Sequence, residues 1–117
     1  MRNNTRIDKI NSEIQRELAI MFRGEMKDPV IAKAMTTVTR VNTTTDLKVC
    51  KAYISVMGTE GKKKEVMKAL KNASGWIRRE IAKRINLRAT PEFTFLIDDS
   101  LDYSMHMDEL FKKIKED

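Results

Sequence analysis

The sequence is poor in the residues that build disulfides, metal sites and irregular loops. It contains one cysteine, one histidine, two prolines and four glycines among 117 residues. A single cysteine cannot form an internal disulfide, and Cys50 lies in an apolar run, so we expect it to be a buried, reduced thiol. Because Cys50 and His106 lie far apart in the sequence, no metal-binding cluster is expected.

Long hydrophobic runs are also missing. No apolar stretch reaches the roughly 18 residues that a membrane span needs. Residues 1–4 lead directly into a polar segment, so we expect no signal peptide. No glycine-rich phosphate loop, cofactor fingerprint or nucleophile–base pair is visible, and we therefore expect neither a cofactor nor an enzymatic activity. These absences favour one small cytoplasmic domain.

What the chain does have is positive charge, and it is concentrated in one segment. The 23 Lys and Arg exceed the 17 Asp and Glu by six. Residues 62–88 alone carry ten basic and two acidic side chains, so the rest of the chain is slightly acidic. This distribution favours an anionic partner, with nucleic acid as the first candidate and an acidic membrane surface as the second.

The basic segment also has the apolar period of a helix. Its apolar residues recur three or four positions apart: Val66, Leu70, Ala73, Ile77, Ile81 and Ile85. The centre is weaker, because Gly75 costs about 1 kcal/mol relative to Ala in a helix and Ser74 competes for backbone hydrogen bonds. We therefore predict two helical halves joined by a kink motif at Ala73, Ser74 and Gly75.

A basic stripe lies opposite the apolar row on a helical wheel. Lys and Arg neutralise phosphates, and a glycine within the stripe lets a strand approach closely. A simply solvated helix face would mix acids and bases more evenly, so we favour nucleic-acid contact over solvation. The candidate RNA-binding residues are Lys62, Lys63, Lys64, Lys68, Lys71, Ser74, Gly75, Arg78, Arg79, Lys83, Arg84 and Arg88.

Before the basic segment, the pattern predicts a helix and a hairpin. The helix covers residues 6–23 and stops at Gly24. A connector follows at residues 25–33, because an Asp-Pro step opposes helical geometry. Two strands, residues 36–41 and 47–57, are separated by turn-forming residues and predict an antiparallel hairpin.

After the second strand, residues 58–61 spell the GxxG loop of K-homology domains. Here the loop joins a strand to a helix and contains an acid, so we expect a plain turn.

A third strand is predicted over residues 92–98. Trp76 has two open roles, stacking on an unpaired base or packing inside the protein.

The order of elements predicts an α+β fold with a three-stranded sheet and helices on one face. Helix, strand, strand, kinked helix pair and strand is the order of the type II K-homology topology, whose two later helices form the nucleic-acid face. We expect residues 1–100 to form this RNA-binding domain. We expect residues 101–117 to form an acidic, weakly helical tail that either packs on the domain or is mobile.

Five short stretches occur in a fixed order along the chain. They are DL at 46–47, AYISV at 52–56, ASGWIRREI at 73–81, LRATPEFTF at 87–95 and DDS at 98–100. Together they resemble the bacterial ribosome-binding factor A family over about residues 5–115. In that family an Ala-x-Gly kink replaces the GxxG loop, and Ala73, Ser74 and Gly75 fit it.

The resemblance implies a role that composition and spacing do not reach. It implies a protein that binds the small (30S) ribosomal subunit late in its assembly and contacts 16S rRNA. It also implies help with 5′-end processing of 16S rRNA and with cold adaptation, and no enzymatic activity. We expect a monomer. Two other hypotheses stay open: a generic RNA- or DNA-binding module without a ribosomal role, and a protein-interaction domain whose basic stripe docks on an acidic protein.

Overall fold

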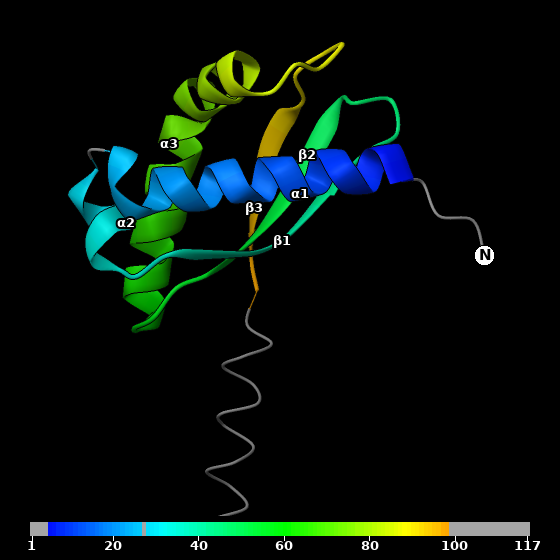
Figure 1. Ribbon diagram of the computed structural model, residues 1–117. Helices are drawn as coiled ribbons and strands as arrows, with labels where there is room; N and C mark the ends of the chain where they lie inside the picture. The colour runs from blue at the N-terminus through cyan, green and yellow to red at the C-terminus, as the bar shows by residue number, and fades with distance from the viewer. Residues whose placement is uncertain (1–4, 27, 99–117) are drawn as a thin grey trace, which may run out of the picture.

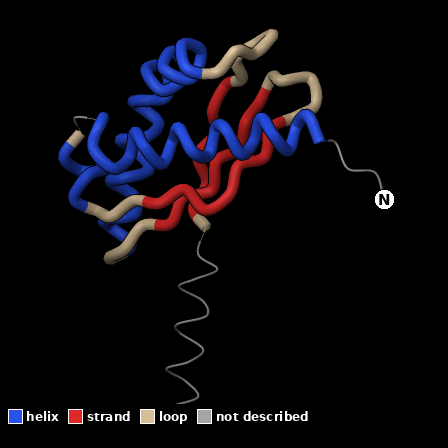
Figure 2. Tube along the Cα trace, in the orientation of Figure 1, coloured by secondary structure: helices blue, strands red, loops and turns tan. Residues whose placement is uncertain are grey.

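The protein folds into one three-stranded sheet with its helices on one side (Figures 1 and 2). The computed structural model describes residues 5–26 and 28–98. The elements are α1 (Thr5–Ile20), η1 (Met21–Glu25), α2 (Pro29–Lys33), β1 (Thr37–Thr43), β2 (Val49–Ser55), α3 (Glu60–Arg84) and β3 (Glu92–Ile97). The predicted α+β class is confirmed. The predicted tail, residues 101–117, lies outside the described residues.

The strand order is β1-β2-β3. β1 and β2 pair antiparallel, which confirms the predicted hairpin, and β2 and β3 pair parallel. A parallel pair needs a crossover connection, and α3 provides it. In β2, Cys50, Ala52 and Ile54 are buried, whereas the alternate residues are half-buried or exposed. One face of the sheet is therefore covered by helices, and the other is open among the described residues.

The first helix does not stop at Gly24 as predicted. The chain continues as a π-helical turn to Glu25, where the Met26 backbone N–H donates to the carbonyl of Met21 at 3.0 Å. This wider turn keeps Met21, Phe22 and Met26 on the buried side. Burial of three large apolar side chains thus outweighs the local stop signal of an exposed glycine.

The predicted connector over residues 25–33 contains a short helix, α2. Asp28 is its N-cap and accepts a hydrogen bond at 2.9 Å from the backbone N–H of Val30. Pro29 occupies the first helical turn, where its missing N–H costs nothing. The Asp-Pro step that ends one helix therefore begins the next, and Ile31 is buried against the core.

Residues 56–59 join β2 to α3, whereas Glu60 and Gly61 already belong to the first turn of α3, so the predicted plain turn covers only half of residues 58–61 and no helix–helix GxxG loop forms there. Thr59 is the N-cap and accepts a hydrogen bond at 3.2 Å from the Lys62 backbone N–H. Gly58 has φ +133°, a conformation that favours glycine.

At the predicted kink, α3 continues as one helix through Ala73, Ser74 and Gly75, and no second helix begins there. Its axis nevertheless changes direction between its two halves (Figure 1). The Ser74 hydroxyl donates to the carbonyl of Lys71 at 2.8 Å, a back-bond that bends helices. The helix ends at Arg84, so the predicted position Arg88 lies in the loop before β3.

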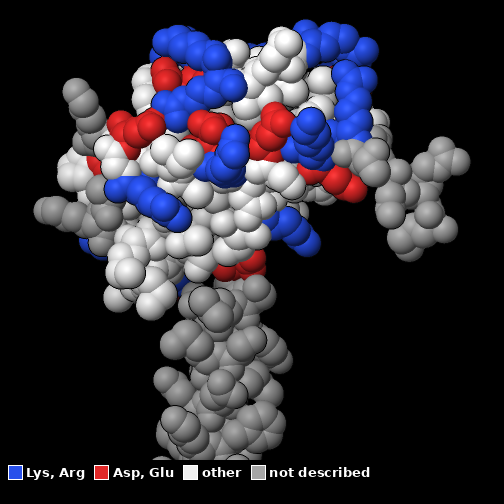
Figure 3. Space-filling model, viewed as in Figure 1, with Lys and Arg blue, Asp and Glu red and all other residues white. Residues whose placement is uncertain are grey.

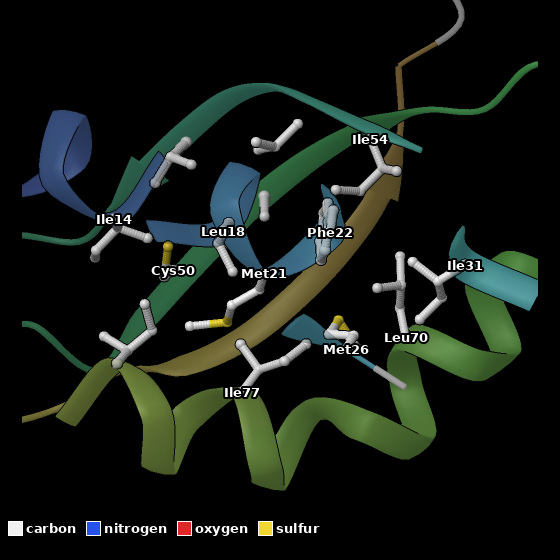
Figure 4. Close-up of a cluster of buried hydrophobic side chains, with 14 of the residues drawn as sticks. Ile14, Leu18, Met21, Phe22, Met26, Ile31, Cys50, Ile54, Leu70 and Ile77 are labelled. Carbon is white, nitrogen blue, oxygen red and sulfur yellow. The ribbon is translucent and has the colours of Figure 1, made fainter. Parts of the chain in front are cut away.

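The core fills the space between the helices and the sheet (Figure 4). Ile14 and Leu18 from α1, Ile54 from β2, and Leu70 and Ile77 from α3 are fully buried there. Cys50 is buried in the same cluster as a free thiol, as predicted. Burial raises the pKa of Cys50 to about 11, against a smaller lowering by the Thr43 side chain, so the thiol is protonated at neutral pH.

Candidate nucleic-acid interface

Five positions of α3 form one exposed stripe. Lys64, Lys68, Lys71, Gly75 and Arg79 follow each other at intervals of three or four residues and lie on its outer side. At about 1.5 Å per residue, the stripe is about 22 Å long. Its four cations form no ion pair with another described residue. This row, which we call the basic stripe, offers fixed positive charges to an extended anion.

Two parts of the surface seen in Figure 3 differ in their charge pattern. In Figure 3, Lys and Arg side chains gather along the upper edge of the view, over the C-terminal part of α3 and the loop that follows. Acidic and basic side chains are interspersed lower down, over α1. Mixed charges on α1 favour solvation, whereas the one-sided surface favours an anionic partner.

An apolar groove lies beside the basic stripe, between α3 and β3. Two adjoining hollows of about 330 and 420 Å³ share Met67 in their walls. Met67, Ser74, Phe93, Phe95 and Ile97 line them, with Lys63, Lys64, Lys71, Thr94 and the carboxylate of Glu60 at the rim. The Phe93 and Phe95 rings are stacked with centroids 6.2 Å apart. We call this feature the α3–β3 groove.

Sequence reasoning did not find the groove. Alternating Phe93 and Phe95 indicated a strand, and nothing in that alternation told which side α3 would leave partly open. Both side chains are only half-buried and pack at the margin of the core. The groove therefore combines aromatic surface with lysines, a combination that suits unpaired bases and their phosphates.

Arg78 is held by the protein itself. Its guanidinium donates two hydrogen bonds, from Nε at 3.2 Å and Nη2 at 2.9 Å, to the backbone carbonyl of Thr90. This clamp fixes the loop between α3 and β3 to the helix. Arg78 remains exposed, but replacing it would also loosen the loop that leads into β3.

Arg84 lies in a cluster of three carboxylates. Its guanidinium pairs with Glu17 of α1 at 3.3 Å, with Glu80 of α3 at 3.1 Å, and with Glu25 of η1. The hydrogen bond with Glu25 raises the pKa of Arg84 further above its usual range. Burial pushes the pKa of Glu80 upward, but hydrogen bonding to Arg84 and the charge of Lys83 outweigh it and lower that pKa overall.

The other predicted cations occupy intermediate situations. Lys63 is largely covered and pairs with Glu60 at 3.7 Å, and Lys83 pairs with Glu80 at 3.4 Å. Lys62 is half-buried at the start of α3, and Arg88 is exposed in the following loop. The structure thus divides the twelve predicted residues into the basic stripe, a set whose side chains contact other described residues, and Lys62 and Arg88, whose side chains form no ion pair with a described residue.

Trp76 is half-buried on the side of α3 that faces η1 and α2. It packs against the core and lines a hollow of about 410 Å³ with Ala73, Met26, Glu25 and Asp28. Of the two roles left open by the sequence, its position favours packing over base stacking.

Gly75 is open to substitution on steric grounds. A Cβ built there meets only the Arg79 guanidinium, at 3.6 Å, which is ordinary van der Waals contact. Because glycine weakens a helix interior, we expect Gly75→Ala to stabilise the fold by about 0.5–1 kcal/mol in urea denaturation. A Gly75→Phe variant should stay folded yet bind RNA about tenfold more weakly, because the ring blocks close approach to the stripe. Unchanged binding by the Phe variant would make the glycine a purely structural residue.

The fold and the surface together define a class of protein: a small α+β domain with a long basic helix face beside an apolar groove. A family model described as "Ribosome-binding factor A" matches residues 6–111. The chain belongs to the ribosome-binding factor A family.

Two relatives carrying this family name align along nearly the whole chain. The protein of Agathobacter rectalis is 47% identical over 120 residues, covering 99% of this chain and 98% of the relative. The protein of Lachnospira eligens is 44% identical over 115 residues, covering 98% of this chain and 88% of the relative.

Solved structures share the fold. A solution structure of a Thermotoga maritima protein has a TM-score of 0.68 and 33% identity, covering 81% of this chain and 89% of its own. The crystal structure of ribosome-binding factor A from Thermus thermophilus has a TM-score of 0.68 at 23% identity. The match covers 78% of this chain and 94% of the Thermus chain. A Thermus thermophilus homology model fitted into a cryo-EM map of a 30S–RbfA complex has a TM-score of 0.60 at 24% identity. The match covers 76% of this chain and 91% of the Thermus chain.

Residues 5–26 and 28–98 offer neither a membrane-spanning helix nor a cluster of metal-binding side chains. None of their helices is long and apolar enough to cross a bilayer. Their His, Cys, Asp and Glu side chains form no group of three placed to hold a metal ion; His106 lies outside this range.

Proposed function

We propose that this protein is a ribosome assembly factor that binds the small (30S) ribosomal subunit through 16S rRNA. One observation carries the proposal: the basic stripe is continuous along the outer side of α3 and uncompensated by described acids. Phosphates are the anions that such a row of fixed cations suits, because each contact releases counterions. The partner named for a related protein, 30S in the Thermus complex, supports the choice of RNA.

Binding on this surface is electrostatic and shape-driven. Lys64, Lys68, Lys71 and Arg79 contact phosphates, and the exposed Gly75 between them lets the backbone come close. The α3–β3 groove then accepts an unpaired base against Phe93 and Phe95. In this respect the domain works as a K-homology-like module whose bent helix replaces the GxxG loop.

Membership of the family supports a finer role, which we propose as an extension of the same function. The protein acts in the cytoplasm as a monomer, without catalysis or cofactor, during late maturation of the subunit. It assists 5′-end processing of 16S rRNA and supports growth in the cold. Arg78 and Arg84 serve the fold first, so the proposal does not depend on them as phosphate contacts.

The proposal is tested by sedimentation of the tagged protein through a sucrose gradient at low and then moderate salt. We expect the protein to migrate with free small subunits and with precursor 16S rRNA, and to leave them as salt rises. It should be absent from joined ribosomes.

Two results would overturn parts of the proposal. Equal affinity for small subunits and for unrelated RNA or DNA duplexes would leave only a generic nucleic-acid module. Binding that survives nuclease digestion and depends little on salt would point to an acidic protein partner.

A further inference from the structure

The α3–β3 groove begins where the described chain ends. Ile97, the last residue of β3, lines the same hollow as Glu60, Lys63, Lys64 and Met67 of α3. Residues that follow β3 therefore start at the mouth of the groove. They need no long connection to reach it.

The sequence after β3 is complementary to this groove in charge. Residues 101–111 contain three acids and neither Lys nor Arg. Lys64 and Lys71 are exposed at the rim of the groove, whereas Lys63 is largely covered and pairs with Glu60, the one carboxylate among the described lining residues. An acidic segment is thus attached next to a lysine-rimmed surface, at high effective concentration.

The same sequence is complementary to the groove in its apolar residues. Met107, Leu110 and Phe111 occupy positions i, i+3 and i+4, which lie on one face of a helix. The groove offers Met67, Phe93, Phe95 and Ile97 as a half-buried apolar floor. Covering that floor would remove apolar surface from water, which favours docking.

The segment is also long enough to return along the groove. β3 has six residues, or about 20 Å at 3.3 Å per residue. Thirteen residues, 99–111, span about 20 Å as a helix and up to about 43 Å when extended, so either form spans the length of β3. Residues 98–100 are Asp, Asp and Ser, which favour the reversal that such a path requires.

We propose that the acidic segment of residues 101–111 docks into the α3–β3 groove of its own chain, where it covers the lysine rim. Docking would occupy the surface that the proposed function assigns to RNA, so segment and RNA compete. The competition rests on the proposed function, whereas docking itself is independent of it. The segment would act as a counter-anion that only a stronger polyanion displaces.

Docking is tested in the full-length chain without RNA. A spin label on Ser104→Cys reports which amides lie near the segment. Cys50 stays unlabelled at pH 7, because it is buried and its pKa is about 11. We expect selective broadening of the Lys64, Met67 and Phe95 amide signals in NMR, with the signals of the first turn of α1 unaffected.

A matched variant provides the control. In the same labelled chain, Leu110→Ser with Phe111→Ser keeps the charge and removes two apolar contacts, so the broadening should disappear. Equal broadening in both chains, or none at the groove in either, would overturn the proposal. Equal broadening on isotope-enriched protein without a label, when it is mixed with spin-labelled protein without isotope enrichment, would assign the groove to a second copy and would also overturn the proposal.

RNA binding supplies a separate readout. If the segment competes, the double variant Leu110→Ser with Phe111→Ser, without a spin label, should bind RNA several-fold more tightly than the parent chain. Docking without any RNA binding would leave the inference standing and defeat the proposed function. RNA binding without docking would defeat the inference and leave the proposed function standing.

Discussion

Reversing three charges of the basic stripe should reduce affinity for the small subunit by about 10²–10³-fold near 0.1 M salt, because each lost phosphate contact costs about 0.9 log units there. The variant is Lys68→Glu with Lys71→Glu and Arg79→Glu. All three side chains lie on the outer side of α3 and are unpaired by described acids, so the fold should survive. Binding is measured by filtration or fluorescence anisotropy, and folding by circular dichroism.

A matched control separates position from net charge. Arg6→Glu with Lys9→Glu and Arg23→Glu makes the same change in charge on α1 and η1, where the three side chains are also exposed. This variant should lose much less affinity. Equal losses in the two triple variants would mean that overall charge, and not the stripe, governs binding.

Replacing Arg84 should weaken the fold rather than the interface. The Arg84 side chain is 24% exposed, and it bridges Glu17 and Glu80, which are 16% and 18% exposed. Arg84→Met leaves these partly covered carboxylates together without their cation. We expect the free energy of unfolding to fall by about 1–2 kcal/mol, between the values for exposed and buried ion pairs. The melting temperature should fall by about 5–10 °C.

Arg16→Met is the control for this effect, because Arg16 is 73% exposed and lies 3.8 Å from the same Glu17. Arg16→Met should change the free energy of unfolding only slightly. If Arg84 were instead a phosphate contact, Arg84→Met would lower RNA affinity while leaving the melting temperature unchanged.

The Arg84 effect should depend on pH in a defined direction. The pKa of Glu80 is lower in the folded protein than its ordinary value of 4.5. Its contribution to stability is therefore complete above pH 4.5 and is lost as the pH falls through the folded value. The stability difference between Arg84→Met and the parent chain should accordingly be constant at neutral pH and shrink below about pH 4.5.

The main elements were predictable because their signals are local. Alternating residues around Cys50 and Ile54 placed β2 and its buried face, and the row from Val66 to Ile81 placed α3 and its core side. The hairpin and the existence of the third strand follow from such patterns.

The errors have physical causes that short patterns do not contain. Gly24 is a sound stop signal, but core burial of Phe22 and Met26 extends the helix past it. Asp28 and Pro29 oppose the helix before them and start the helix after them. At Gly24 tertiary packing decides where the helix ends. At Asp28 and Pro29 the same two residues end one helix and begin the next.

The candidate interface was predictable in outline and not in detail. The spacing of Lys64, Lys68 and Lys71 indicated an exposed basic row. It could not indicate that Arg84 meets acids 59 and 67 residues away, or that Arg78 clamps a carbonyl 12 residues away. Such pairings depend on the tertiary fold, and they decide which cations are available to a partner.

The salt dependence of small-subunit binding tests the role of the basic stripe most directly. The logarithm of the affinity is measured against the logarithm of salt concentration for the parent chain and for the Lys68, Lys71 and Arg79 reversal. If these residues neutralise phosphates, the slope should become shallower by about 2–3, since each contact contributes about 0.7–0.9. Equal slopes for the two proteins would contradict the assignment of the stripe to rRNA.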